Sequence, residues 1–231
     1  MEIPYLRFIT VKDILSIFKH PLKAYKMLTG KPDYLNFVSK VTDKSERICR
    51  SYLPKGRSRQ VLVYMSGGHA LSAPIHWEQA TALYLIIRIL RPSYVVETGA
   101  GRSTIFMLYA LEDIKQGHLY SIDINPKVAS LIPRELASRW TFINGYSRDV
   151  LPILLYKIGK IDIFFHDSDH SYENMMFEFE TVWTYLAEGG VLLSHDTDLN
   201  TAFEEFVKSK NVLPYFLGRK YRMGGIRKLQ K

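Results

Sequence analysis

The chain has 231 residues, 47% of them hydrophobic and 23% charged, which suits one full domain with an extension and excludes a disordered, collagen-like or coiled-coil protein. Its single cysteine, Cys49, excludes an internal disulfide and a cysteine-built metal site, and favours a reducing, cytoplasmic setting. The net charge of +8 is unevenly distributed along the chain. Residues 1–60 carry 13 Lys and Arg against 5 Asp and Glu, residues 61–207 carry 10 against 18, and residues 208–231 carry 8 against none. A nucleic-acid binder that is basic throughout would not show an acidic middle segment.

Residues 1–60 predict a basic helical extension. Apolar residues recur at helical spacing in Thr10–Phe18, Pro21 separates this helix from the next, and lysines flank the apolar stripe. Two roles stay open for the stripe: packing on the main domain, and peripheral contact with an anionic membrane surface. No apolar run approaches the roughly 20 residues of a spanning helix, and Glu2 and Asp13 interrupt the N-terminus, so we expect neither a membrane span nor a secretory signal.

Residues 61–231 alternate apolar strands with helices, the pattern of a parallel sheet covered on both faces. The predicted helices are Trp77–Leu90, Ser103–Leu111, Val150–Tyr156 and Tyr172–Leu186. The predicted strands are Tyr94–Glu97, His118–Asp123, Trp140–Asn144, Ile161–His166 and Val191–His195, the last preceded by a stop at Gly189 and Gly190. Tyr215–Leu217 and Tyr221–Lys228 look like an antiparallel pair near the edge. We therefore expect an α/β, doubly wound, Rossmann-like and mostly parallel sheet with a C-terminal antiparallel edge strand.

A glycine turn follows the first strand of this domain. Gly99 and Gly101 allow close approach of a ligand, and Ser103 and Thr104 begin a helix whose amides can bind an anion. Thr104 stands where a dinucleotide motif has its third glycine, and Glu97 would repel a pyrophosphate, so a nicotinamide oxidoreductase is disfavoured. A ligand with a carboxylate, an amine and a sulfonium suits this turn, which favours S-adenosylmethionine.

The second strand ends at Asp123, which is 26 residues after Glu97. A carboxylate at this place can accept hydrogen bonds from both ribose hydroxyls, and nucleotide sites of related folds carry one after roughly 20 residues. Together with Glu97 and the glycine turn, Asp123 therefore predicts a ribose contact.

Motifs at further strand ends point to one family. They are Asp123-Ile124-Asn125-Pro126, Asn144-Gly145-Tyr146-Ser147-Arg148-Asp149, Asp167-Ser168-Asp169-His170-Ser171-Tyr172 and Gly189-Gly190 with His195-Asp196-Thr197. From about residue 70 to 197 the chain resembles the class I S-adenosylmethionine-dependent methyltransferases. The likeness is greatest to the catechol and caffeoyl-coenzyme A O-methyltransferases and looser to the cephalosporin-biosynthesis methyltransferases.

The resemblance implies a role for each matching residue. Glu97, Gly99, Gly101, Ser103 and Thr104 would hold the methionine half of the cofactor. The remaining cofactor contacts would come from Asp123 at the ribose, Ile124 beside the adenine, Ser147 with Arg148 at the adenine edge, and Asp167 near the methyl donor.

The resemblance also implies how the acceptor hydroxyl is activated. In the family a divalent cation on Asp, Asp and Asn lowers the hydroxyl's pKa, and a Lys is the base. Asp167 and Asp196 stand at the Asp positions, Thr197 replaces the Asn, and His170 replaces the Lys, so we expect Mg²⁺ or another divalent cation on the first three and His170 as base.

Alternatives stay open at this end of the sheet. Asp169, His195 or Asp198 could complete the metal site instead. If the last parallel strand alternates through His195, this residue faces away from Asp196 and belongs to the core. Asp169 could equally cap the helix that follows.

The expected activity is O-methylation of a small-molecule, sugar or glycan hydroxyl, by a cytoplasmic and in part peripheral enzyme that can form homodimers. The alternative is a non-catalytic cofactor- or nucleotide-binding module, or a membrane-surface interaction protein, that keeps the fold. A nucleic-acid methyltransferase is disfavoured, because Asp167-Ser168-Asp169-His170 stands where those resembled families carry Asn/Asp-Pro-Pro-aromatic.

Overall fold

The computed structural model describes residues 34–42, 46–53, 75–217 and 223–229. Its strands are β1 (Tyr94–Thr98), β2 (His118–Asp123), β3 (Trp140–Asn144), β4 (Ile161–His166), β5 (Leu186–Ser194), β6 (Pro214–Leu217) and β7 (Met223–Arg227). Its helices are α3 (Tyr34–Thr42), α4 (Glu46–Tyr52), α6 (Trp77–Leu90), α7 (Arg102–Ile114), α8 (Ser147–Ile158), α9 (Tyr172–Tyr185) and α10 (Ala202–Lys210), with short 3-10 helices η2 (Pro126–Leu131) and η3 (Arg134–Arg139).

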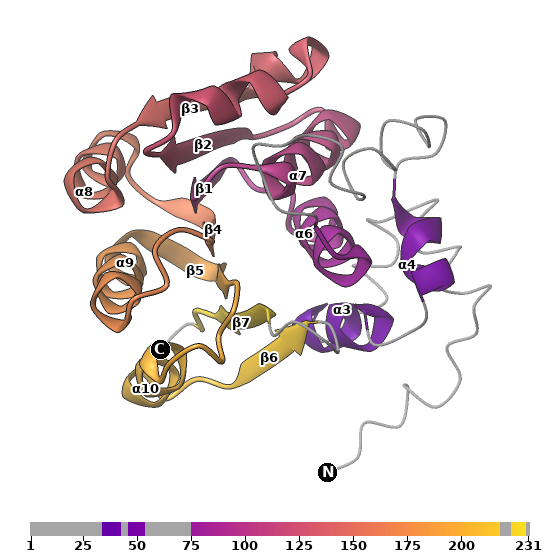
Figure 1. Ribbon diagram of the computed structural model, residues 1–231. Helices are drawn as coiled ribbons and strands as arrows, with labels where there is room; N and C mark the ends of the chain where they lie inside the picture. The colour runs from indigo at the N-terminus through magenta and orange to yellow at the C-terminus, as the bar shows by residue number, and fades with distance from the viewer. Residues whose placement is uncertain (1–33, 43–45, 54–74, 218–222, 230–231) are drawn as a thin grey trace.

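The strands form one sheet in the order β3-β2-β1-β4-β5-β7-β6. β1 to β5 pair in parallel, whereas β7 pairs antiparallel with both β5 and β6. Helices α8, α9 and α10 cover one face, and α3, α6 and α7 lie on the other (Figure 1). The predicted doubly wound α/β sheet is confirmed, and so is the C-terminal antiparallel pair, in which β6 is the edge and β7 lies inside.

Side chains that alternate along each strand build two separate cores. In β4, Ile163 and Phe165 pack into the core beneath α6 and α7, whereas Phe164 packs into the core beneath α8, α9 and α10. Leu192 of β5 faces the same way as Phe164. In β1, β4 and the second half of β5 both faces are buried, so these strands are almost continuously apolar and could be predicted from the sequence.

The junction between α9 and β5 differs from the prediction. The predicted glycine stop is wrong: α9 ends at Tyr185, β5 begins directly at Leu186, and both glycines lie within the strand. The amide of Gly189 donates to the carbonyl of Lys228 at 2.7 Å, and the amide of Lys228 donates to the carbonyl of Gly190 at 2.9 Å. Partners near the end of the chain therefore extend β5 backwards, and β5 ends at Ser194 instead of His195.

Part of the basic extension packs on the sheet domain. The hydroxyl of Ser39 in α3 donates to the carbonyl of Phe216 in β6 at 2.8 Å. The hydroxyl of Thr81 in α6 donates to the carbonyl of Cys49 in α4 at 3.3 Å, and the Arg50 guanidinium lies 4.2 Å from the centre of the Trp77 ring. The predicted helix Thr10–Phe18 and the predicted boundary near residue 60 lie outside the described residues.

Candidate functional site

Four neighbouring parallel strands bring their carboxyl ends to one edge of the sheet. Glu97 lies in β1, Asp123 ends β2, and Asp167 and His195 directly follow β4 and β5. Ligands of open parallel sheets bind at this edge, where the strand order changes direction between β1 and β4. The topology therefore gathers the candidate residues of four separate motifs.

The glycine turn after β1 is in direct contact with the end of β4. The amide of Asp167 donates to the carbonyl of Thr98 at 2.8 Å, and the amide of Gly99 donates to the carbonyl of Ile122 at 2.8 Å. Gly99 has a φ of 85°, and a Cβ added to it would lie 1.9 Å from the Asp167 carbonyl oxygen. Only glycine fits here, because a side chain would meet the backbone of the residue that carries the site carboxylate.

Glu97 is fully buried within a polar network of its own. Its carboxylate accepts hydrogen bonds from the Ser121 hydroxyl and, at 2.7 Å, from the Thr104 hydroxyl, which in turn accepts from the Gly101 amide at 2.8 Å. Burial raises the pKa of Glu97 to about 8, although the two hydroxyl hydrogen bonds oppose this shift. The second carboxylate oxygen has no hydrogen-bond partner among the described residues.

The hydrogen bonds around Glu97 occupy several of the residues predicted to bind the methionine half of the cofactor. Thr104 bonds within the protein, and its neighbour Ser103 is buried in the first turn of α7. Gly101 immediately precedes α7, so its amide is the one that Thr104 caps. The second carboxylate oxygen of Glu97 still lacks a hydrogen-bond donor among the described residues, and the ammonium group of a ligand could donate to it.

Asp123 closes the glycine turn from the β2 side. Its carboxylate accepts from the Ala100 amide at 2.8 Å and from the Asn125 amide at 2.7 Å. Ile124 beside it is 62% exposed, and Tyr146 after β3 is 66% exposed. Two exposed apolar side chains at the ends of adjacent strands offer the kind of surface on which an adenine ring packs.

Ser147 and Arg148 contact α9. The Ser147 hydroxyl donates to the Asn174 side-chain oxygen at 3.3 Å, and the Arg148 guanidinium lies 4.8 Å from the centre of the Phe177 ring. In this structure both side chains thus bridge α8 to α9.

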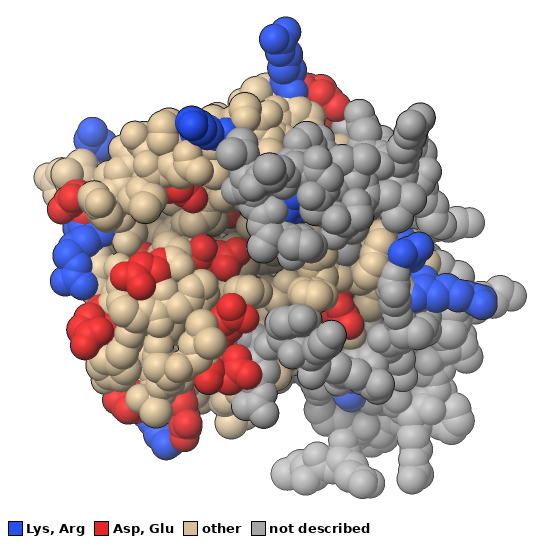
Figure 2. Space-filling model, viewed as in Figure 1, with Lys and Arg blue, Asp and Glu red and all other residues tan. Residues whose placement is uncertain are grey.

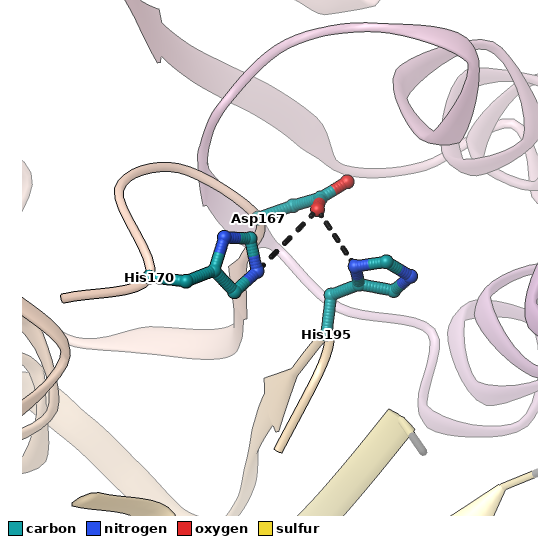
Figure 3. Close-up of side chains that lie close together, drawn as sticks. All are labelled: Asp167, His170 and His195. Carbon is teal, nitrogen blue, oxygen red and sulfur yellow. Dashed lines mark ion pairs between the residues drawn. The ribbon is translucent and has the colours of Figure 1, made fainter. Parts of the chain in front are cut away.

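Asp167, His170 and His195 form a compact cluster, which Figure 3 shows with the two rings on either side of the carboxylate. The Asp167 Oδ1 atom lies 3.1 Å from His195 Nδ1 and 4.0 Å from His170 Nε2. The side chains are 31%, 21% and 20% exposed for Asp167, His195 and His170, so the cluster is partly open to solvent. Of the two alternatives left open for His195, the structure favours the one in which it lies beside Asp167 over the one in which it belongs to the core.

The two rings of the cluster have pKa values shifted in opposite directions. Burial lowers the pKa of His170, and the neighbouring His166 lowers it further. For His195 burial acts in the same direction, but contact with Asp167 and the charges of Asp196 and Asp198 outweigh it and raise the pKa. His170 is thus the ring that stays neutral to lower pH, as a proton acceptor requires.

Behind His170 lies a buried polar network. The centres of the His166 and His170 rings are 5.0 Å apart, and His166 Nδ1 lies 2.7 Å from the Glu178 carboxylate. Glu178 also accepts hydrogen bonds from Thr98 at 2.6 Å, Ser168 at 2.9 Å and Asn174 at 3.0 Å. Burial pushes the pKa of Glu178 up, but these hydrogen bonds and the His166 ring hold it below its ordinary value.

Sequence reasoning missed this network. His166 and Glu178 are fully buried, and Glu178 lies on α9 at a position that periodicity assigns to the apolar core. A signal was present, because a carboxylate on the buried face of an otherwise apolar helix requires a partner.

The other predicted metal ligands lie on different sides of the Asp167–His170–His195 cluster's His195: Asp196 contacts its ring, and Thr197 packs against β7. Asp196 has a φ of 45°, and its Oδ2 lies 3.3 Å from His195 Nδ1. Thr197 is only 8% exposed, and its methyl group would be 2.8 Å from a Cβ on Gly224 of β7. Asp169 is exposed and accepts hydrogen bonds from the amide and hydroxyl of Ser171 at 2.9 and 3.0 Å.

Comparisons with known proteins agree with this architecture. A family model described as a methyltransferase domain matches residues 96–197, and none of the curated proteins matches the sequence. An O-methyltransferase of Bacillus cereus, solved with S-adenosylhomocysteine, is 16% identical with a TM-score of 0.60 over 84% of this chain and 100% of its own. The TomG O-methyltransferase of tomaymycin synthesis in Streptomyces achromogenes, solved with S-adenosylmethionine, is also 16% identical, with a TM-score of 0.59 over 84% of this chain and 95% of its own.

A methyltransferase of Geobacter sulfurreducens is 18% identical, with a TM-score of 0.58 over 80% of this chain and 98% of its own. These likenesses support the fold, and the family match covers the segment that runs from β1 to the residues just after β5. These findings agree with the resemblance predicted from the strand-end motifs: residues 96–197 match a methyltransferase domain, and the fold is that of the O-methyltransferases solved with S-adenosylhomocysteine and S-adenosylmethionine.

Proposed function

We propose that this enzyme transfers the methyl group of S-adenosylmethionine to a hydroxyl of a small molecule, a sugar or a glycan. The observation that carries the proposal is the contact between the glycine turn and the Asp167–His170–His195 cluster. The turn suits the methionine half of the cofactor, and the cluster holds groups that act on a hydroxyl proton. A donor site and an acceptor site that share a backbone contact fit direct methyl transfer.

The cofactor contacts follow from the free groups of the site. The unpaired oxygen of Glu97 would accept a hydrogen bond from the amine of the cofactor, and the carboxylate of Asp123 would turn to the ribose hydroxyls. Ile124 would pack on the adenine, because its exposed side chain has no apolar cover of its own. Gly99, Gly101, Ser103, Thr104, Ser147 and Arg148 would shape the pocket around these contacts.

The cluster would activate the acceptor. Bound S-adenosylmethionine supplies the methyl group and its own leaving group, so the protein has only to orient the acceptor and remove its proton. We propose Asp167 and His170 as the catalytic residues of this step, with His170 taking the proton directly or helping to hold an ion that lowers the hydroxyl's pKa.

The partners beyond the acceptor are part of the proposal. Contact with an anionic membrane would rest on the basic N-terminal segment, most of which lies outside the described residues, and homodimer formation is proposed from the likeness in fold. In the described part of the tail, Lys208 pairs with Glu204 and Lys210 with Glu180, each at 2.6 Å. Figure 2 shows acidic side chains gathered over α8, α9 and α10, so these lysines do not add to a basic face. Within the described ranges no helix is both long and apolar enough to cross a membrane.

Titration calorimetry with S-adenosylhomocysteine tests the cofactor site. We expect micromolar binding by the wild type, and a loss of at least about tenfold, or 1.4 kcal/mol, in Asp123→Ala because two ribose hydrogen bonds are removed. Asp149→Ala is the matched control, since this exposed carboxylate lies on α8. Equal affinity of both variants and the wild type would contradict the ribose contact, and an absence of binding by the wild type would favour a module that only keeps the fold.

A further inference from the structure

Among the described residues, three ligand atoms converge at the edge of the sheet next to the glycine turn. An oxygen of Asp167 and one ring nitrogen each of His170 and His195 all lie within 4.8 Å of one another. They come from two segments that lie far apart in the sequence: the loop between β4 and α9, which holds Asp167 and His170, and the residue directly after β5, His195. Such convergence of two imidazoles and a carboxylate around one point is the arrangement of a metal site.

Neither of the two ring nitrogens meets the geometry of a hydrogen bond within the described residues, although both are buried atoms. His195 Nδ1 lies 3.1 Å from the Asp167 carboxylate and 3.3 Å from that of Asp196, and His170 Nε2 lies 4.0 Å from Asp167. Buried polar atoms are normally hydrogen-bonded, so two ring nitrogens that gather on one carboxylate without such a bond suit a shared ion. In Figure 3 the nearer nitrogen of each ring is directed at the carboxylate.

We propose that Asp167, His170 and His195 bind one divalent transition-metal ion of the Zn²⁺, Co²⁺ or Mn²⁺ type, in place of the Mg²⁺ on Asp167, Asp196 and Thr197 that the resemblance implies. The inference rests on the proposed function, because the ion would sit where the acceptor hydroxyl is activated. It gives His170 the role of a ligand, so the ion would lower the pKa of the hydroxyl in place of a free imidazole base.

The donor atoms decide the class of metal. Mg²⁺ selects oxygen ligands in a nearly octahedral arrangement, whereas imidazole nitrogen suits Zn²⁺ and its neighbours among the transition metals. Thr197 is buried against β7, and a neutral hydroxyl is a poorer ligand than the Asn that it replaces. Two nitrogens and one carboxylate oxygen leave open positions on the ion, as catalytic sites require.

The distances require only small movements. Ligands at about 2.1 Å from an ion are about 3.0–3.4 Å apart in octahedral or tetrahedral geometry. Asp167 and His195 already meet this spacing at 3.1 Å, and His170 has to approach Asp167 from 4.0 Å. Because His170 lies in the loop between β4 and α9, a change in its side-chain rotamer can supply that movement.

The site is also supported from behind. The ring of His170 packs edge-on against His166, which the buried Glu178 holds through a 2.7 Å contact. Glu178 in turn accepts a hydrogen bond from Ser168, which lies in the same loop as His170. A rigid outer layer of this kind keeps a ligand loop in place and is typical of metal sites in proteins.

The test is metal binding by the untagged, metal-free protein. It is dialysed against Zn²⁺, or against Co²⁺ as a spectroscopic probe, in excess Mg²⁺, and metal content and visible Co²⁺ absorption are measured. We expect one equivalent of bound metal and Co²⁺ bands in the wild type. In His170→Ala and His195→Ala affinity should fall by at least the roughly 10–100-fold that loss of an outer-layer partner costs. His118→Ala is the control, because His118 starts β2 at the opposite edge of the sheet and lies 2.8 Å from Thr141.

The same preparations are titrated with S-adenosylhomocysteine, which separates this inference from the proposed function. Retained S-adenosylhomocysteine binding shows that a variant is folded, so loss of metal binding in that variant is then a ligand effect. A wild type that binds S-adenosylhomocysteine but no metal, or that binds Zn²⁺ as weakly as Mg²⁺, overturns the metal inference alone. Equal metal binding by His118→Ala and both cluster variants also overturns it, whereas loss of S-adenosylhomocysteine binding by the wild type overturns the proposed function.

Discussion

Replacing Gly99 with alanine tests the contact between the glycine turn and the cluster. The new methyl group would lie 1.9 Å from the Asp167 carbonyl oxygen and 3.0 Å from the Ser168 amide nitrogen, so the turn or the end of β4 must move. Two costs add up: about 1–2 kcal/mol for an alanine in left-handed backbone, and about 1–3 kcal/mol for the overpacking. We expect Gly99→Ala to lower the free energy of unfolding by about 2–5 kcal/mol.

Gly159 supplies a matched control for the backbone term. Its φ of 78° is close to that of Gly99, but a Cβ added to it would meet no atom within 4 Å. Because its ψ of −134° places it in a region of backbone conformation used mainly by glycine, Gly159→Ala should cost only a conformational part of about 1–3 kcal/mol. A larger loss of stability in Gly99→Ala than in Gly159→Ala would report the close approach at the site.

Urea unfolding of both variants and the wild type gives the comparison, with unchanged slopes as the check that only stability has altered. S-adenosylhomocysteine affinity is measured on the same samples. We expect Gly99→Ala to bind more weakly, because its turn is displaced, and Gly159→Ala to bind as the wild type does. Equal destabilisation by the two substitutions, with S-adenosylhomocysteine affinity unaffected in both, would refute the close approach and the geometry argued from it.

Two further predictions concern the buried carboxylates. The pKa of Glu97 is about 8 in the folded protein and about 4.3 in the unfolded chain, so the folded protein binds its proton more tightly. Stability from this proton is therefore fully present below about pH 4.3 and is lost as pH rises to about 8. Glu97→Gln should thus gain stability relative to the wild type across this window, by up to about 1.4 kcal/mol per pH unit, and a difference independent of pH in urea unfolding would contradict the assignment. Glu178→Ala should cost about 3–5 kcal/mol in the same assay because it leaves His166 without its carboxylate. Glu173→Ala, at an exposed position of α9, should cost less than about 1 kcal/mol, and similar losses in the two variants would argue against the buried network.

Most of the sheet could be predicted from the sequence because its strands are short, rich in apolar or aromatic residues and bounded by turn residues. The bounds of Trp77–Leu90, His118–Asp123, Trp140–Asn144 and Ile161–His166 agree with the structure residue for residue. Each of these segments is apolar and ends at a proline, a glycine or a polar turn, so local chemistry marks both limits.

The bounds of elements that depend on partners far away in the sequence could not be predicted from local residue patterns. The extension of β5 back to Leu186 follows from the pairing of Leu186 with Ile161 of β4 and from the hydrogen bonds of Gly189 and Gly190 with Lys228, which no local pattern indicates. Helix α10 was not predicted, although Phe203, Phe206 and Val207 share one buried face at helical spacing. In that segment the short polar run before Ala202 obscures the start of the helix.

The cluster shows how much depends on one residue at a strand end. A strand that continued through His195 would turn its ring to the face opposite Asp196, and this is the alternative in which His195 belongs to the core. In the structure β5 ends at Ser194, which is in register with His166 of β4. The two residues that follow, Asp167 and His195, then leave neighbouring strand ends side by side, and the His195 amide donates to the His166 carbonyl at 2.9 Å. Parallel register, once the strand ends are known, is thus sufficient to bring this carboxylate and this imidazole together, whereas side-chain alternation applied one residue too far separates them.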